Sequence, residues 1–352
     1  MDDTTTELEQ EQEAFEARRE DASQDEERRL RRGLVSLVLL VILVGALMLA
    51  VPGLRDVADR LSEVNPAWIA AAIALEIGSC AGYVLAFQMV FYRVPPRAAA
   101  RVALSEMAFG AVVPAGGAGG IAVGAWWAKA KGGSLGRFMH RSAVLFLITS
   151  GVNAATLGLA GVLAGLHVLR VPHPFLLGMV PGLIGVAAVV GFWNVPRLAR
   201  RAAAGASEAG RGRRWLGVTA AVVEDAKAEV LRGDWRLLGA VAYLWCDIAM
   251  LWVCFHAFGA APPVGALTLA FIIGYLGNIV PVPGGIGALD GGLTGAMILY
   301  GMSPASAAAG VLLYHAIVLW IPTLLGTIAF LRLRGTIDEP VVLRPERAPA
   351  KA

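Results

Sequence analysis

Long apolar stretches, separated by short clusters of charged residues, make up most of the chain. Six of them reach the length of about 18 residues that a helix needs to cross the hydrocarbon core of a bilayer, and they lie near residues 34–51, 66–91, 142–169, 174–193, 235–258 and 306–331. We therefore expect an all-α polytopic membrane protein with six full spans.

Arginine and lysine residues beside these stretches set the expected orientation, because they favour the cytoplasmic side. Four arginines precede the first span, and Arg332 and Arg334 follow the last. The polar tails at residues 1–33 and 333–352 are therefore placed in the cytoplasm, as is the basic loop at residues 196–234. Arginines of this loop are interpreted as topology signals and its apolar residues as a short helix on the membrane surface, with lipid or partner binding as the alternative.

Two further apolar stretches are interrupted by glycine and proline. Residues 102–128 have basic clusters on both sides, so the pattern favours a hairpin that enters and leaves from the cytoplasm. Residues 262–301 carry a single charge, Asp290, and are expected to enter and leave on the outer side. The centres of both stretches, Pro114–Gly120 and Pro281–Gly287, are poor continuous helices.

The order of these elements repeats within the proposed transmembrane domain, residues 34–332. Repeat one, about 66–169, and repeat two, about 235–331, each consist of a span, a broken re-entrant hairpin and a span, in opposite orientations. Such inverted repeats form substrate sites between broken helices. The alternative is that the glycines only form two helix-packing faces.

The two hairpin tips are the predicted substrate-binding elements. Non-helical backbone at membrane depth is tolerated where it is buried in protein or lines a water-filled cavity, and the N-terminus of each second leg attracts an anion such as phosphate. The candidate residues are Pro114, Gly116, Gly117, Gly119, Gly120, Asn278, Pro281, Pro283, Gly284, Gly285, Gly287 and Asp290.

Charged residues inside the apolar stretches form a second group of candidates. An ionised carboxylate at a helix centre costs about 2.5–3.5 kcal/mol on insertion scales, yet Glu76 and Asp247 lie near the middle of corresponding spans, and Glu106 lies on the first hairpin. Each acid is interpreted either as a functional group or as a protonated hydrogen bonder. Arg141 either extends to the interface or contacts phosphate, and His315 is either a packed neutral imidazole or a ligand.

The composition excludes several other classes of protein. Hydrophobic residues make up 57% of the 352 residues and charged residues only 16%, whereas a soluble domain has about 25% charged residues. The net charge of +3 indicates no nucleic-acid partner. The three cysteines and the histidines have no metal-binding spacing, no catalytic constellation is defined, and no cofactor is expected.

Four motifs resemble the transmembrane-domain family of lysylphosphatidylglycerol synthases. They are Asn278–Asp290, Leu312–Gly326, Pro114–Gly120 and Leu147–Asn153. The resemblance implies a bundle with two re-entrant hairpins that moves aminoacylated phospholipids between leaflets or handles lipid-carried sugars or hopanoids. Family members often carry Glu at position 290 and Arg at position 315, so this chain has a shorter carboxylate and lacks a permanent charge there.

The expected function is a flippase in the cytoplasmic membrane that acts on a phospholipid or a polyprenyl-linked head group. Because only a short polar tail follows the last span, the soluble aminoacyl-transferase domain of full-length synthases is expected to be absent, and the chain is not expected to be an enzyme. The alternative is an accessory subunit or enzyme of a lipid-glycan or lipid-modification pathway. Its expected partners are membrane lipids and a lipid-modifying enzyme.

Overall fold

The computed structural model describes residues 65–112, 118–204, 211–260, 262–276 and 287–337, together with residues 339 and 344. All regular structure in these ranges is helical. The predicted span at 34–51, the tail at 1–33 and most of the tail at 333–352 lie outside them. So do eight of the predicted tip residues, namely Pro114, Gly116, Gly117, Asn278, Pro281, Pro283, Gly284 and Gly285.

Five described helices are long and apolar enough to cross a membrane, which confirms five of the six predicted spans. The helices are α3 (Pro66–Val90), α4 (Pro96–Val112), α5 (Ala118–Ala130), α6 (Leu135–Gly165), the π-helix η1 (Pro174–Met179), α7 (Val180–Ala204), α8 (Arg211–Leu231), α9 (Leu237–Ala257), α10 (Val264–Gly274), α11 (Ala288–Leu299) and α12 (Pro304–Gly335).

Several helix ends extend beyond the predicted limits. Helix α6 begins at Leu135, before the apolar stretch expected from residue 142, and α4 begins at Pro96. The predicted loop at 196–234 is largely helical, because α7 continues to Ala204 and the expected surface helix is part of the longer α8. The extra turns carry arginines, which are good helix formers.

Side-chain caps fix the starts of two spans. The Asn65 side chain accepts a hydrogen bond from the Ala67 N–H (2.9 Å), and Ser303 accepts one from the Ser306 N–H (3.3 Å). In both places proline follows the cap at the first helical position, where no N–H is needed. Helices α3 and α12 therefore begin at sharply defined residues.

Helices α3 and α9 cross in backbone contact. A Cβ atom at Gly82 would lie 2.7 Å from the Gly239 carbonyl oxygen, and one at Gly239 would lie 2.5 Å from the Gly82 carbonyl oxygen. At the other end of the contact, the rings of Trp68 and His256 are 5.8 Å apart. Residues early in α3 thus face residues late in α9, so the two helices are antiparallel, and glycine allows their close approach.

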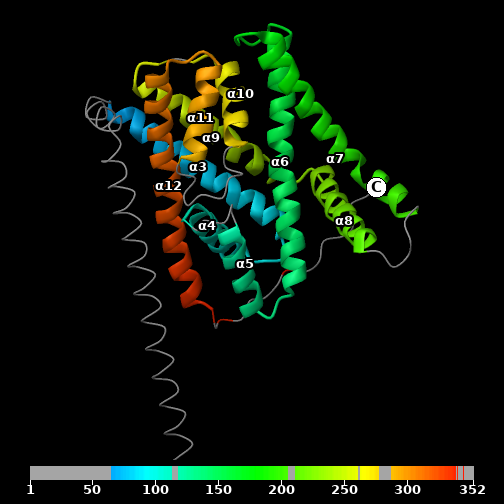
Figure 1. Cartoon of the computed structure of the whole chain (residues 1–352). Coiled ribbons are helices and arrows are strands. Elements are labelled where there is room, and N and C mark those ends of the chain that lie inside the picture. Colours follow the sequence, from blue (N-terminus) through cyan, green and yellow to red (C-terminus); the bar gives the residue numbers. More distant parts are fainter. Residues whose placement is uncertain are drawn as a thin grey trace, which may run out of the picture. The chain divides into compact units, whose positions relative to one another are not determined.

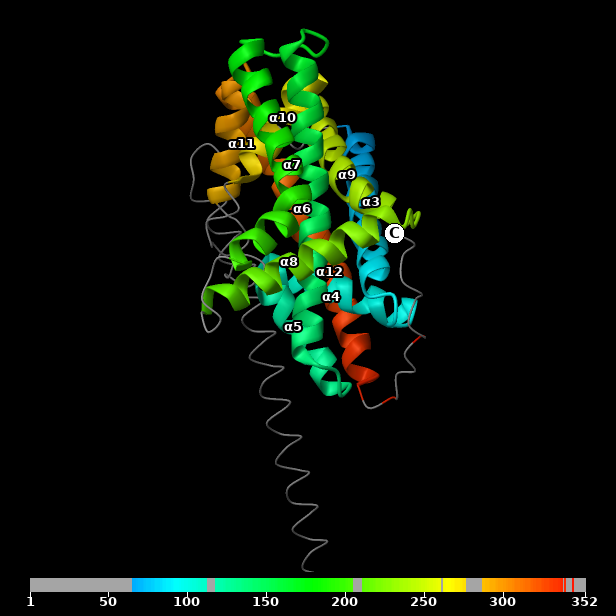
Figure 2. The ribbon, with the colours of Figure 1, turned by 90° about the vertical axis from the view of Figure 1, so that its right-hand side faces the viewer.

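Two pairs of short helices flank this crossing. Helix α4 packs on α5, and α10 packs on α11. Figure 1 shows α4 and α5 in the lower part of the view and α10 and α11 in the upper part, and the same separation is seen after a 90° turn in Figure 2. Helix α4 also packs against α12, and α10 against α6, so each pair contacts the long helix of the other half.

Candidate functional site

Glu76 and Asp247 come together at the α3–α9 crossing. The antiparallel register places them opposite each other, and the two carboxyl groups lie within electrostatic range. Glu76 is 2% exposed and Asp247 is 8% exposed. The Cys80 thiol lies 3.8 Å from Glu76 Oε1, but Glu76 Oε2 has no hydrogen-bond partner among the described residues.

Polar groups continue from this pair toward the first hairpin. The Ser79 hydroxyl, one turn after Glu76, donates a hydrogen bond to the Tyr243 carbonyl (3.1 Å). The ring centre of Tyr243 lies 5.4 Å from that of Tyr83, and the Tyr83 hydroxyl donates to Glu106 Oε2 over 3.5 Å. The acid of the first hairpin is therefore connected to the α3–α9 crossing by side chains rather than isolated from it.

Glu106 lies where the two legs of the first hairpin touch. It is 6% exposed, and a Cβ atom at Gly120 would collide with its carbonyl oxygen. Gly119 and Gly120, the two predicted tip residues described here, are buried in the first turn of α5. Glycine at position 120 is thus required for the close approach of α4 and α5.

Asp290 and His315 form the corresponding contact at the second hairpin. His315 Nδ1, on α12, lies 2.5 Å from Asp290 Oδ1, in the first turn of α11. The other oxygen, Oδ2, accepts a hydrogen bond from the Gly287 N–H (3.0 Å), and Gly287 has a φ of 85°, which glycine adopts at little cost. The carboxylate thereby caps α11 and joins it to α12.

The N-terminus of α11 therefore already holds a negative group. A carboxylate in the first turn is favourable at the positive end of a helix, so an acid of the chain itself lies at the end where the sequence predicted an anion to bind. No such acid stands in the first turn of α5.

Helix α12, which carries His315, also approaches the central pair. Tyr314, which precedes His315 on α12, is fully buried and lies within electrostatic range of Asp247. Its hydroxyl has no hydrogen-bond partner among the described residues. We call these buried and half-buried side chains the buried polar series; it comprises Glu106, Tyr83, Tyr243, Asp247, Glu76, Tyr314, His315 and Asp290.

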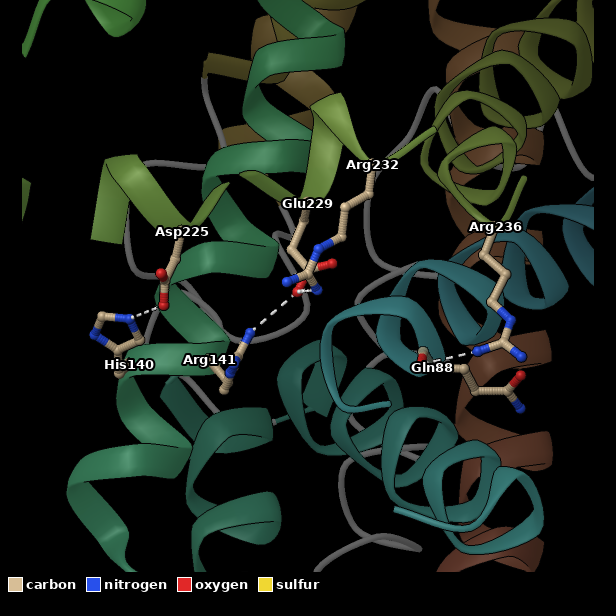
Figure 3. A network of polar contacts seen from close by, with 7 residues as sticks. All are labelled: Gln88, His140, Arg141, Asp225, Glu229, Arg232 and Arg236. Atoms are coloured by element: carbon tan, nitrogen blue, oxygen red, sulfur yellow. Dashed lines mark hydrogen bonds and ion pairs between the residues drawn. The ribbon is translucent and has the colours of Figure 1, made fainter. Parts of the chain in front are cut away.

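Arg141 belongs to a different network, between α6 and α8 (Figure 3). Its guanidinium lies 3.3 Å from Glu229 Oε1, and that of Arg232 contacts the same oxygen at 3.3 Å. One turn earlier on α8, Asp225 Oδ2 lies 2.9 Å from His140 Nε2. Glu229 is 3% exposed, so the network fixes α8 against the start of α6.

Sequence reasoning missed the acidic half of this network. Asp225 and Glu229 are four residues apart and so lie on one face of α8. Their spacing on a helix that begins with an arginine cluster was the available signal. Sequence reasoning also missed the contacts of Lys131 at the end of α12. Its Nζ donates hydrogen bonds to the carbonyl oxygens of Thr336 (2.9 Å), Ile337 (2.6 Å) and Glu339 (2.5 Å).

The fold and these sites define an α-helical membrane domain with two pairs of short helices around a buried acidic crossing. The family model described as the lysylphosphatidylglycerol synthase TM region matches residues 34–326. The chain belongs to this family. No curated protein matches it. Within the described residues, no group of three or more His, Cys, Asp or Glu side chains is placed to hold a metal ion.

Proposed function

We propose that this chain is a lipid transporter that moves a phospholipid or a lipid-linked head group between the two leaflets. The observation that carries the proposal is the buried polar series, which runs between the two hairpins. Polar side chains inside a membrane bundle are costly and mark substrate or ion pathways. Polar side chains between the two hairpins supply groups that a head group can contact as it crosses.

The repeated order of helices supports the same proposal. The first half contains helices of 25, 17, 13 and 31 residues, α3 to α6, and the second contains 21, 11, 12 and 32 residues, α9 to α12. The antiparallel α3–α9 contact is the contact expected where two inverted repeats meet. Transporters built in this way bind substrate between broken helices and open alternately to each side.

The charges favour a head group with both an anionic and a cationic or hydroxyl part. The first turn of α5 offers N–H groups without a competing acid, which suits a phosphate. The acids of the series, Glu106 and Asp290 at the hairpins, suit an amine or sugar hydroxyls. The acyl chains need no site, because they remain in the bilayer beside the apolar faces of the spans.

The test is a head-group movement assay in liposomes that contain the purified protein. Phosphatidylglycerol and its lysyl ester, each with a labelled head group, serve as probes, and an external quencher reports the fraction in the inner leaflet. Asp290→Asn is the informative variant, since the amide still accepts the Gly287 N–H while the charge beside His315 is removed. We expect the transport rate to fall about tenfold or more, a change of about 1.4 kcal/mol in the barrier.

The matched control is Asp225→Asn, which removes a carboxylate that also contacts a histidine but lies outside the buried polar series. It should transport at the wild-type rate. Mass spectrometry of the recovered lipids separates the proposal from its alternative. A covalently modified lipid would favour the enzyme or accessory-subunit function, and no movement of either probe by the wild-type protein would refute transport of these lipids.

A further inference from the structure

The carboxyl groups at the α3–α9 crossing have no cation opposite them. Neither Glu76 nor Asp247 has an ion-pair partner within 4 Å in the described part of the chain. The titratable groups that face the pair come from α3, α9, α12 and the end of α10, and all are neutral in their ordinary state: Cys80, Tyr243, Cys246, Tyr275 and Tyr314.

Two ionised carboxylates cannot remain together in such surroundings. Burial of one uncompensated charge already costs several kcal/mol, and two carboxylates that share a site repel each other, so one of them keeps a proton. A nearby arginine or lysine could also compensate a buried negative charge, as happens for Glu229 on α8. In the described part of the chain, no such cation contacts this pair. A proton is the smallest change that makes the arrangement stable.

Unpartnered polar atoms point independently to a missing hydrogen. Glu76 Oε2 is buried without a hydrogen-bond partner, and as an ionised oxygen it could only accept. A proton on this oxygen turns it into a donor toward Asp247 across the crossing. The hydroxyl of Tyr314, also buried and unpartnered in the described structure, is in electrostatic range of Asp247 and can donate to the carboxylate that stays ionised.

We infer that Glu76 and Asp247 form a proton-binding site that shares one proton, and that uptake and release of this proton couple transport to the pH difference across the membrane. The coupling rests on the proposed function; the site itself does not. Because α3 and α9 belong to different halves, loss of the shared proton places two like charges across their contact. Deprotonation therefore pushes the halves apart, and protonation draws them together.

Packing distinguishes a proton from a larger cation. The two carboxyls are almost completely buried, and the helices that carry them touch through their backbones at Gly82 and Gly239. An amine head group or a hydrated metal ion requires these helices to separate. A proton can be bound in the structure as it stands.

Infrared spectroscopy of the protein in lipid nanodiscs tests the site without any transport assay. A protonated carboxyl has a C=O stretch, shifted by deuteration, that is separate from carboxylate and amide bands. We expect the wild type to show this band at neutral pH and to lose it on alkalinisation. The double variant Glu76→Gln/Asp247→Asn should lack the pair's contribution at every pH, while Asp225→Asn should keep it. The single variants serve if the double variant does not fold.

The variant Glu106→Gln can remove only the contribution of Glu106 to the infrared carboxyl band. It therefore distinguishes Glu106 from the Glu76–Asp247 pair. Identical spectra for wild type and the double variant would overturn the site. So would a band that disappears on addition of Na⁺ at constant pH, because the bound cation would then not be a proton.

The coupling is tested in liposomes with a pH difference across the membrane. The wild-type rate should follow that difference, and the double variant should transport about tenfold more slowly with no response to it. A wild-type rate that ignores pH would overturn the coupling. If the infrared band is present but no lipid moves, the proton site stands and the proposed transport function fails.

Discussion

The two halves of the domain, α3–α6 and α9–α12, have the same order of helices but opposite chemistry at their hairpins. The first hairpin is surrounded by cations: Lys131 bonds the end of α12, and Arg141 bonds Glu229 on α8. At the second hairpin, Asp290 on α11 contacts His315 on α12.

This difference bears on the proposed opposite orientations of the two halves in the membrane. The apolar length of each helix determines that it inserts, whereas the flanking charges determine which end stays in the cytoplasm. The basic residues that flank helices lie mostly in the first half, whereas both halves carry buried acids, Glu76 and Glu106 in the first and Asp247 in the second.

The largest effect is expected where the halves meet. Gly82→Val places side-chain atoms against the backbone of α9, because even a Cβ atom there would lie 2.7 Å from the Gly239 oxygen and the Tyr243 nitrogen. Backbone atoms cannot move aside cheaply, so we expect a loss of about 3 kcal/mol or more. Thermal unfolding followed by size-exclusion chromatography measures it. Gly151→Ala on α6, where an added Cβ meets nothing within 4 Å, is the control and should be at least as stable as wild type.

A second pair of substitutions compares the hairpins directly. Gly120→Ala on α5 forces a Cβ atom into the Glu106 carbonyl, whereas Gly291→Ala in the first turn of α11 meets nothing within 4 Å. We expect the first to cost about 2 kcal/mol and the second to be neutral or to gain up to about 1 kcal/mol. Equal losses in the same unfolding assay would contradict the difference in packing between the two second legs.

Removal of the anion at the α6–α8 contact should have a smaller effect. Glu229→Gln leaves Arg141 and Arg232 without their shared carboxylate, and both arginines are about a quarter exposed, so water compensates in part. We expect a loss of about 1–2 kcal/mol. Asp225→Asn, at a more exposed contact, should cost less than about 1 kcal/mol. If the two variants lose the same unfolding free energy, burial of Glu229 does not strengthen the network.

Single cysteines should leave stability unchanged and report orientation only. Arg97→Cys at the start of α4 and Ser134→Cys before α6 are exposed and flank the first hairpin; Val168→Cys is exposed beyond the other end of α6. A membrane-impermeant thiol reagent should label the first two from the cytoplasmic side and Val168→Cys from the outside. Labelling of Arg97→Cys and Ser134→Cys from opposite sides would mean that α4 and α5 cross the membrane together as one span.

Apolar length and flanking charge were sufficient to predict the described spans and the division of both interrupted stretches into two helices. They could not place helix ends, because arginine-rich turns continue a helix past the apolar core, as in α6 and α7. The adjacency of Glu76 and Asp247 depends on the antiparallel register of α3 and α9, which is set by Gly82 and Gly239, 157 residues apart in the chain. No local pattern contains that information.

The pairing of Arg141 shows a second limit. A cation at the edge of a span looks the same in the sequence whether it faces water, phosphate or protein. Its partner Glu229 lies on a helix that packs on α6 from a distant part of the chain, and only that packing decides among the three. Asp290 and His315, by contrast, were recognised individually as ionisable side chains inside apolar stretches, and their contact explains why both positions carry such side chains.

Helix α12 is attached at two points that belong to different hairpins. Near its middle His315 contacts α11, and at its end the carbonyls of Thr336 and Ile337 accept hydrogen bonds from Lys131, the residue after α5. With 32 residues and a rise of about 1.5 Å per residue, the helix is about 48 Å long and contacts elements of both halves. Pro322 lies between the two attachments and interrupts the hydrogen bonding of the helix there. The helix is therefore easiest to bend between its two attachments.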